Sequence, residues 1–257
     1  MRLVFNKRSG PPMKTVRHQT VHQLAFLPRL FPVNAYFVEE EDGLTLIDAA
    51  LPYSSKGIME AAKIIGKPIT RIVLTHAHGD HVGALDALRE ALPYVPVYLS
   101  ARDARLLDGD LSLDEGEPST PIRGDIPKKV KTRPDVLLRD GDRIGSLTAI
   151  AAPGHTPGSM AFLDARSRAL VVGDAFQVRG GFAVSGQMRI LFPFPAMATW
   201  NADAALESAR KLAALKPSLI AAGHGRMIQQ PAAVLERAIR QAEFRQGGKS
   251  HVAANRS

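Results

Sequence analysis

Three histidines and an aspartate occur within six residues of one another, at His76, His78, Asp80 and His81. They follow a short, β-branched apolar run that predicts a buried strand. Imidazole and carboxylate groups together are ligands for zinc and related divalent metals. Gly79 allows the chain to turn sharply, so one turn can direct all four side chains into a small volume. The pattern therefore predicts a metal site at the carboxyl end of a strand, where open α/β sheets carry their ligand sites.

The run from His76 to His81 resembles the signature of the metallo-β-lactamase superfamily. Members of that family have three further metal ligands downstream, in the order histidine, aspartate, histidine. The sequence offers His155 in a Pro-Gly-His-Thr-Pro-Gly run, Asp174 after Val-Val-Gly, and His224 between two glycines. Each alone would be ordinary, as a turn residue, a helix cap or a surface histidine. The resemblance, which covers about residues 34–224, implies that the ordered set binds metal.

The resemblance also implies how the ligands divide between two metal ions. One metal has His76, His78 and His155, the other has Asp80, His81 and His224, and Asp174 bridges them. Seven ligands are too many for one tetrahedral zinc, whereas two metals ~3.5–4 Å apart can hold a hydroxide between them. We expect two divalent ions per chain, zinc first, with iron or manganese as alternatives. The catalytic groups would be this hydroxide and Asp80, with no serine or cysteine nucleophile.

The substrate class follows less directly from the sequence. A bridging Asp174 favours the broad hydrolase and lactonase branch of the family, so we expect a metal-dependent hydrolase of lactones, esters or amides. Acyl-homoserine lactonases usually carry a tyrosine just after this aspartate, but the chain continues Ala175-Phe176, which argues against that particular activity. Two alternatives stay open: a phosphodiesterase or nuclease of the same family, and a non-hydrolytic, iron-dependent, oxygenase-like member.

Apolar runs that alternate with helical patterns predict an α/β fold. The resemblance narrows this to a four-layer αββα sandwich with the metals between the two sheets at one edge. Asp48, at the end of a predicted strand, is either a helix cap or, by the resemblance, a residue that supports the metal ligands. His18 and His22 share one face of a strand-like stretch and are expected to be structural. The expected strands cover about 15–27, 34–38, 44–48, 72–74, 95–99, 136–138, 147–152, 159–163, 169–172 and 217–222, and the helices about 55–65, 101–107, 200–215 and 231–245.

Composition restricts the class of protein and its partners. The 257 residues carry a net charge of +8 and no cysteine, which excludes a disulfide framework. The start of the chain has no apolar segment typical of a signal peptide, and no run is long enough to span a membrane. We expect one domain over residues 1–257, poorly ordered at 1–13 and 247–257, in a cytoplasmic protein. We expect a small-molecule substrate as its partner, and neither a membrane nor nucleic acid. Whether the chain forms a homodimer stays open.

In two long segments, the apolar residues recur with neither helical nor strand spacing. Residues 108–134 are rich in glycine, proline and charge, with the tightest basic cluster at Lys128, Lys129, Lys131 and Arg133, and are either mobile or functional. Residues 175–199 carry aromatic and methionine side chains, among them Phe182 and Met188. These side chains form a pocket wall, pack on the loop itself or contact a second subunit.

Overall fold

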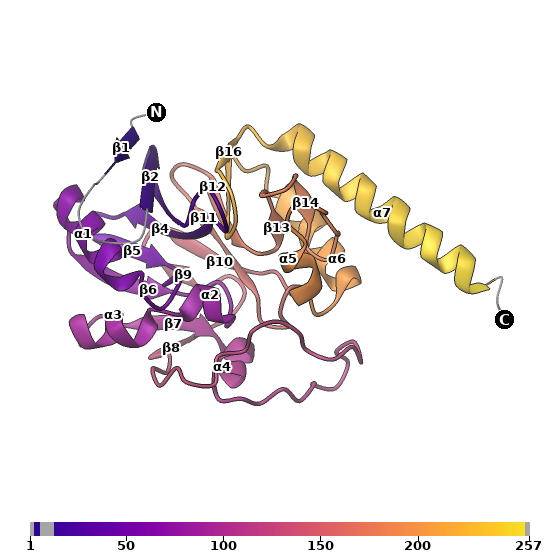
Figure 1. Cartoon of the computed structure of the whole chain (residues 1–257), viewed down its shortest axis with the longest axis horizontal. Helices are drawn as coiled ribbons and strands as arrows, with labels where there is room; N and C mark the ends of the chain where they lie inside the picture. Colours follow the sequence, from indigo (N-terminus) through magenta and orange to yellow (C-terminus); the bar gives the residue numbers. More distant parts are fainter. Residues whose placement is uncertain (1–2, 6–12, 255–257) are drawn as a thin grey trace.

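Two β-sheets face each other in this protein, and helices cover the outer face of each sheet (Figure 1). The computed structural model describes residues 3–5 and 13–254. The first sheet has eight strands in chain order: β1 (Leu3–Phe5), β2 (Met13–His18), β3 (Val21–Phe26), β4 (Val33–Glu39), β5 (Leu44–Ile47), β6 (Ile69–Val73), β7 (Val97–Ser100) and β8 (Val136–Leu138). The second sheet has six strands in the order β16 (Ile228–Gln229), β15 (Leu219–Ala222), β12 (Ala169–Gly173), β11 (Met160–Asp164), β10 (Leu147–Ala151) and β9 (Arg143–Ile144).

Seven helices and a small hairpin complete the described part of the chain. The helices are α1 (Ser55–Ile65), α2 (Gly79–Val82), α3 (Leu85–Ala91), α4 (Ala101–Leu107), α5 (Phe194–Ala198), α6 (Ala202–Ala214) and α7 (Ala232–Ala254). The hairpin pairs β13 (Phe176–Gln177) with β14 (Ala183–Val184). Helices α1, α3 and α4 bury side chains against the first sheet, whereas α6 and α7 bury theirs against the second.

Strand alternation builds three separate hydrophobic cores between the four layers. On β4, Phe37 packs towards α1, while its neighbours Tyr36 and Val38 pack between the sheets. On β12, Leu170 packs towards α6 and α7, while Val171 packs between the sheets. Because successive side chains of a strand point to opposite faces, a strand buried on both sides must be apolar throughout. The three cores confirm the four-layer αββα sandwich expected from the sequence.

The carboxyl ends of the parallel strands meet at one edge of the sandwich. Strands β5 to β8 are parallel in the first sheet, as are β12 and β15 in the second. Hydrogen bonds join the sheets here: Met160 N donates to Thr75 O at 2.8 Å, and Asn34 N donates to Gly223 O at 2.9 Å. The Tyr36 hydroxyl donates to Ala222 O at 2.6 Å. These bonds fix the relative position of loops that belong to different sheets.

Most elements have the expected bounds, with two differences. The stretch expected as one strand over 15–27 is a hairpin of β2 and β3, with its turn at Gln19, which has a φ of 50°. Helix α7 continues to Ala254, past its expected end near Arg245, because Gly247 and Gly248 inside a helix cost only about 1 kcal/mol each.

The poor order expected at the two ends of the chain stays a prediction. Leu3–Phe5 pairs with β2, and 247–254 continue α7. Residues 1–2, 6–12 and 255–257, on which the prediction also falls, lie outside the described residues. Within the described chain, no helix is both long enough and apolar enough to cross a bilayer.

Candidate metal centre

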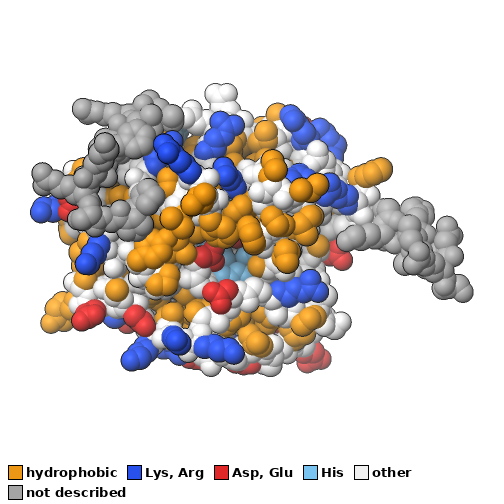
Figure 2. Space-filling view, in the orientation of Figure 1, with side chains coloured by type: hydrophobic (Ala, Val, Ile, Leu, Met, Phe, Trp, Pro, Cys, Tyr) orange, Lys and Arg blue, Asp and Glu red, His pale blue; other side chains and the backbone are white. Residues whose placement is uncertain are grey.

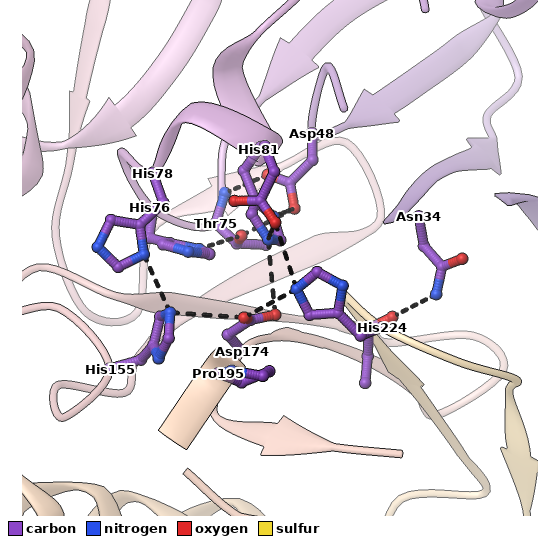
Figure 3. Close-up of polar contacts among 12 residues, drawn as sticks. Asn34, Asp48, Thr75, His76, His78, His81, His155, Asp174, Pro195 and His224 are labelled. Atoms are coloured by element: carbon purple, nitrogen blue, oxygen red, sulfur yellow. Dashed lines mark hydrogen bonds and ion pairs between the residues drawn. The ribbon is translucent and has the colours of Figure 1, made fainter. Parts of the chain in front are cut away.

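The seven residues singled out in the sequence lie together at the edge where the two sheets meet (Figure 3). They come from four different loops. The turn after β6 and the start of α2 carry His76, His78, Asp80 and His81, the β10–β11 loop carries His155, and Asp174 and His224 follow β12 and β15. Three groups have potential ligand atoms within 4.8 Å of one another: His76, His78 and His155; His76, His81 and Asp174; and Asp80, His81 and His224.

Asp174 lies at the centre of this cluster. Its Oδ2 is 3.4 Å from His155 Nε2 and 3.2 Å from His224 Nε2, while its Oδ1 is 3.5 Å from His81 Nε2. The carboxylate therefore lies against histidines from both halves of the expected ligand set. Gly223 makes this approach possible, because a Cβ at that position would collide with Asp174 Oδ1 and with the His81 ring.

Each histidine presents one ring nitrogen to the cluster and holds the other on the protein. Outside the cluster, His76 Nδ1 contacts Thr75 Oγ1 at 3.0 Å and His78 Nε2 donates to Arg123 O at 2.9 Å. His224 Nδ1 donates to Pro32 O at 2.7 Å. His81 Nδ1 contacts Asp48 Oδ2 at 2.8 Å, and His155 Nδ1 contacts Ser185 Oγ at 3.2 Å and Thr199 Oγ1 at 3.3 Å. Such contacts fix the ring orientation and the tautomer of metal-binding histidines.

Two buried carboxylates hold the loops that carry the histidines. Asp48 accepts hydrogen bonds from Thr75 N at 2.7 Å and Thr75 Oγ1 at 2.8 Å, besides its contact with His81. It therefore supports the candidate ligands, the second of the two roles considered from the sequence, and it caps no helix. Asp103, on α4, was not identified from the sequence.

The contacts of Asp103 explain why it matters. Its Oδ2 accepts from Ala77 N at 2.9 Å and from Thr156 Oγ1 at 2.8 Å, and its Oδ1 accepts from Gly158 N at 2.8 Å. One side chain thus joins the loop of His76 and His78 to the loop of His155. Nothing in the sequence pattern indicates this, because an aspartate in the first turn of a helix is usually a surface residue.

Burial keeps two of the histidines neutral. Desolvation, with the positive charge of neighbouring histidines added, holds the pKa of His76 well below its usual value. Desolvation likewise lowers the pKa of His155 to about 3. Neutral imidazole is the form that binds a metal, so these two side chains need not release a proton to do so.

At His81 and Asp174, the charges of neighbouring side chains outweigh the effect of burial on the pKa. Burial disfavours protonation of His81, but the carboxylates of Asp80, Asp48 and Asp174 outweigh burial and raise its pKa to about 10. Burial also opposes ionisation of Asp174, but His224, His81 and His155 outweigh burial and hold its pKa well below the usual range. The carboxylates therefore stabilise positive charge at the nitrogens that point into the cluster.

These residues fit divalent cations. Within the described chain, three buried polar atoms of the cluster lack a hydrogen-bond partner: His76 Nε2, His81 Nε2 and Asp174 Oδ1. Such atoms are rare in folded proteins and call for an explanation such as an ion. The 3.0 Å between His78 Nδ1 and His155 Nε2 is close to the ~3.3 Å that separates two nitrogens on one tetrahedral zinc.

A cavity of about 420 Å³ opens onto the cluster. One wall is apolar, with Phe31, Phe194, Pro195, Met197 and Ala198, and the other is formed by Gly124 and Asp125. No lysine or arginine lines the cavity among the described residues. Phe31 was missed in the sequence because it lies almost 200 residues from His224 along the chain, yet their rings are 5.5 Å apart.

The two segments without a clear period both contribute to this site. From 108–134, Arg123 O accepts from His78, Asp125 O accepts from Gly79 N at 2.8 Å, and Thr120 O accepts from Trp200 Nε1 at 2.7 Å. This segment is therefore functional in the sense that it positions His78. Its basic cluster at 128–133 does not line the cavity.

The segment 175–199 divides into two parts. Phe176 and Phe192 are buried, and Phe182 stacks on Phe176 with ring centroids 5.4 Å apart, so this part packs on the domain. Only its end, in and around α5, forms the cavity wall. Of the three alternatives left open by the sequence, a pocket wall does not apply to Phe182 or Met188. Phe182 packs against the core of the second sheet, Met188 is exposed, and neither lines the cavity.

Two other histidines, His18 and His22, lie away from the cluster. The side chain of His22 is buried and its Nε2 contacts Glu39 Oε1 at 2.7 Å, as befits the structural role expected. His18 pairs with Val21 across the β2–β3 hairpin. Neither His18 nor His22 belongs to a candidate metal group of the described chain.

Comparison with known proteins identifies the family of this chain. Residues 28–224 match the model of the metallo-beta-lactamase superfamily. The uncharacterized protein YobT of Bacillus subtilis (strain 168) is 56% identical over 231 residues, which is 90% of this chain and 99% of YobT. The probable metallo-hydrolase YflN of the same organism is 31% identical, over 75% of this chain and 80% of YflN.

A solved structure, TTHA1623 in a di-iron-bound form, superposes with a TM-score of 0.58 and 31% identity. The match covers 81% of this chain and 94% of TTHA1623. The family model covers most of the chain, and the four-layer fold agrees with it. The chain therefore belongs to the metallo-β-lactamase superfamily.

Proposed function

We propose that this chain is a binuclear metal-dependent hydrolase of small, uncharged carbonyl substrates: lactones, esters or amides. The observation that carries the proposal is the cavity, which has the histidine–aspartate cluster at its base, an apolar wall and, among its described lining residues, no lysine or arginine. His76, His78 and His155 would hold one metal, Asp80, His81 and His224 the other, and Asp174 both. The two metals would supply a bridging hydroxide as nucleophile and polarise the substrate carbonyl. We expect zinc first, and the di-iron form of TTHA1623 keeps iron open as an alternative.

Asp80 has a catalytic role in this proposal. It is the one member of the cluster that is not fully buried, and it lines the cavity. Its Oδ2 lies 3.4 Å from His224 Nε2 and 3.9 Å from His81 Nε2, so the carboxylate faces both the cluster and the substrate space. From there it can accept the proton that a water releases as it becomes the hydroxide nucleophile, and it can return that proton to the leaving group.

The lining of the cavity favours an uncharged substrate over an anionic one. Apart from the proposed metals, nothing in the lining would bind the negative charge of a phosphodiester, because no lysine or arginine is among the described lining residues. Phosphodiester hydrolysis and iron-dependent oxygenation nevertheless stay as named alternatives. A small-molecule partner, no nucleic-acid partner and a cytoplasmic location belong to the same proposal, and a homodimer stays open.

A substrate panel tests the proposal. Purified protein loaded with zinc or with iron is offered lactones, carboxylic esters, amides and phosphodiesters, with an oxygen electrode recording any oxygen uptake. We expect turnover of an uncharged lactone, ester or amide without oxygen uptake. Turnover of phosphodiesters alone, or oxygen consumption without hydrolysis, would replace the proposal with the corresponding alternative.

Met197 on the apolar wall should set a preference for long acyl chains. A Met197→Ala variant should lower kcat/KM for a long-chain ester about ten-fold, because the chain loses the apolar contact of one large side chain. A short-chain ester should be hardly affected. Met188→Ala is the matched control, since Met188 is exposed and does not line the cavity. Equal selectivity in the two variants would show that the wall does not contact the substrate.

A further inference from the structure

Large apolar side chains lie on one side of the entrance of the cavity and are exposed to solvent. Leu30 is 80% exposed, Ile190 93% and Leu191 84%, and Phe194 and Met197 are also exposed. We call these five residues the apolar rim. Leu30 comes from the β3–β4 loop, and the other four come from the segment that ends in α5. Phe31 of the loop contacts Phe192 of that segment, with ring centroids 4.9 Å apart. Figure 2 shows a band of hydrophobic side chains beside the opening in which histidine is visible.

A basic groove of about 720 Å³ lies on the other side of the same β3–β4 loop. Its basic lining side chains are Lys14, Arg17, His18, Arg179 and Arg226, and Pro28 and Pro32 of the loop also line it. No aspartate or glutamate lines the groove among the described residues. Arg179 Nη2 donates to Arg29 O at 2.9 Å, so the groove adjoins the loop that carries Leu30.

The two features together fit one kind of surface. Apolar side chains at loop tips insert between lipid tails at the edge of a bilayer, and adjacent basic side chains attract anionic headgroups. We propose that this face of the protein binds the surface of a membrane that contains anionic lipid, with the apolar rim inserted and lipid phosphates in the basic groove. The entrance of the metal cavity would then open towards the bilayer.

A second copy of the chain fits this face less well. A two-fold dimer places the same patch on both subunits, so the basic grooves would lie close to each other and repel. A flat protein partner on the rim would also cover the cavity, because Phe194 and Met197 belong both to the rim and to the cavity wall. Nucleic acid would use the groove but would leave the exposed leucines and isoleucine without a partner.

The inference goes beyond the proposed function, because membrane binding requires neither metal nor turnover. It also changes one expectation from the sequence, that no membrane is a partner. No helix of the described residues could span a bilayer, but we now expect the protein to bind a membrane surface.

Vesicle sedimentation tests the inference with the full chain. We expect the protein to bind vesicles of phosphatidylcholine mixed with phosphatidylglycerol, and to bind pure phosphatidylcholine about ten-fold more weakly. Raising the salt should weaken the binding to mixed vesicles, because salt screens the basic groove. The Leu30→Asp/Leu191→Asp double variant should bind the vesicles at least about ten-fold more weakly than the unchanged protein. The Arg226→Glu variant should lose the preference for vesicles that contain the anionic lipid.

Tyr94→Asp is the matched control. Tyr94 is 95% exposed but precedes β7, so it lies at the opposite edge of the sheet from the metal cluster. This variant should bind as the unchanged protein does, and thermal unfolding should show that all variants fold. Failure of the unchanged protein to bind mixed vesicles would overturn the inference.

Two other outcomes would assign the face to a different partner and also overturn the inference. One is a dimer in solution that the double variant converts to a monomer, with no binding to vesicles. The other is binding to a single-stranded oligonucleotide that depends on Arg226 but not on Leu191.

Discussion

Replacing Asp174 with alanine should remove metal from both positions of the centre and abolish hydrolysis. The Asp174 carboxylate lies 3.4 Å or less from His155 Nε2 and His224 Nε2, and 3.5 Å from His81 Nε2, so it is in contact with both halves of the ligand set. Its loss also removes a buried negative charge from the site that should bind two dications. We expect the metal content to fall below one ion per chain and kcat to fall about a thousand-fold or more.

Asp80→Ala is the matched control for this experiment. Asp80 belongs only to the group with His81 and His224. Its removal should weaken one metal and leave the ion held by His76, His78 and His155 in place. Elemental analysis of both variants after gel filtration makes the comparison. If Asp174→Ala kept both ions, Asp174 would not lie between them.

Replacing Asp103 with alanine should destabilise the fold and loosen the centre, although Asp103 contacts no candidate ligand side chain directly. Ala77 N, Gly158 N and Thr156 Oγ1 would all lose their buried acceptor. An unsatisfied buried donor costs about 1–3 kcal/mol, so we expect the free energy of unfolding to fall by about 3–5 kcal/mol. The His76 and His155 loops would move apart, and metal affinity should fall about 10- to 100-fold.

Urea unfolding and a metal titration with a chromophoric competitor measure the two effects of Asp103→Ala. Asp108→Ala is the control, because Asp108 lies at the end of the same helix, is exposed and pairs with Arg133 at the surface. An exposed ion pair contributes about 0–1 kcal/mol, so this variant should be nearly neutral. If Asp103→Ala were equally neutral, the hydrogen bonds of Asp103 would not hold the two loops together.

The sequence predicted the cluster because its main part is local. His76, His78, Asp80 and His81 lie on one turn, and a family resemblance supplied His155, Asp174 and His224 in order. The strands were predictable for a related reason, since a strand buried on both faces is apolar along its whole length. The hairpin missed at Gln19 turns without glycine or proline.

The supporting residues could not be predicted because they act across long sequence separations. Asp103 joins two loops that lie 26 and 53 residues away along the chain, and its own neighbours indicate only a helix start. Phe31 contacts Phe194 with ring centroids 5.2 Å apart, a contact that exists only once the two sheets have packed. The same holds for the apolar rim and the basic groove, which bring together segments that are unremarkable in sequence.

Metal stoichiometry tests the central claim most directly. The protein is stripped with a chelator, dialysed against zinc and, separately, against ferrous iron without oxygen, and its metal content is measured by mass spectrometry alongside hydrolysis of the best substrate of the panel. We predict two ions per chain, no hydrolysis after stripping, and recovery of hydrolysis on readdition of metal. Full activity with one ion or none per chain would contradict the account.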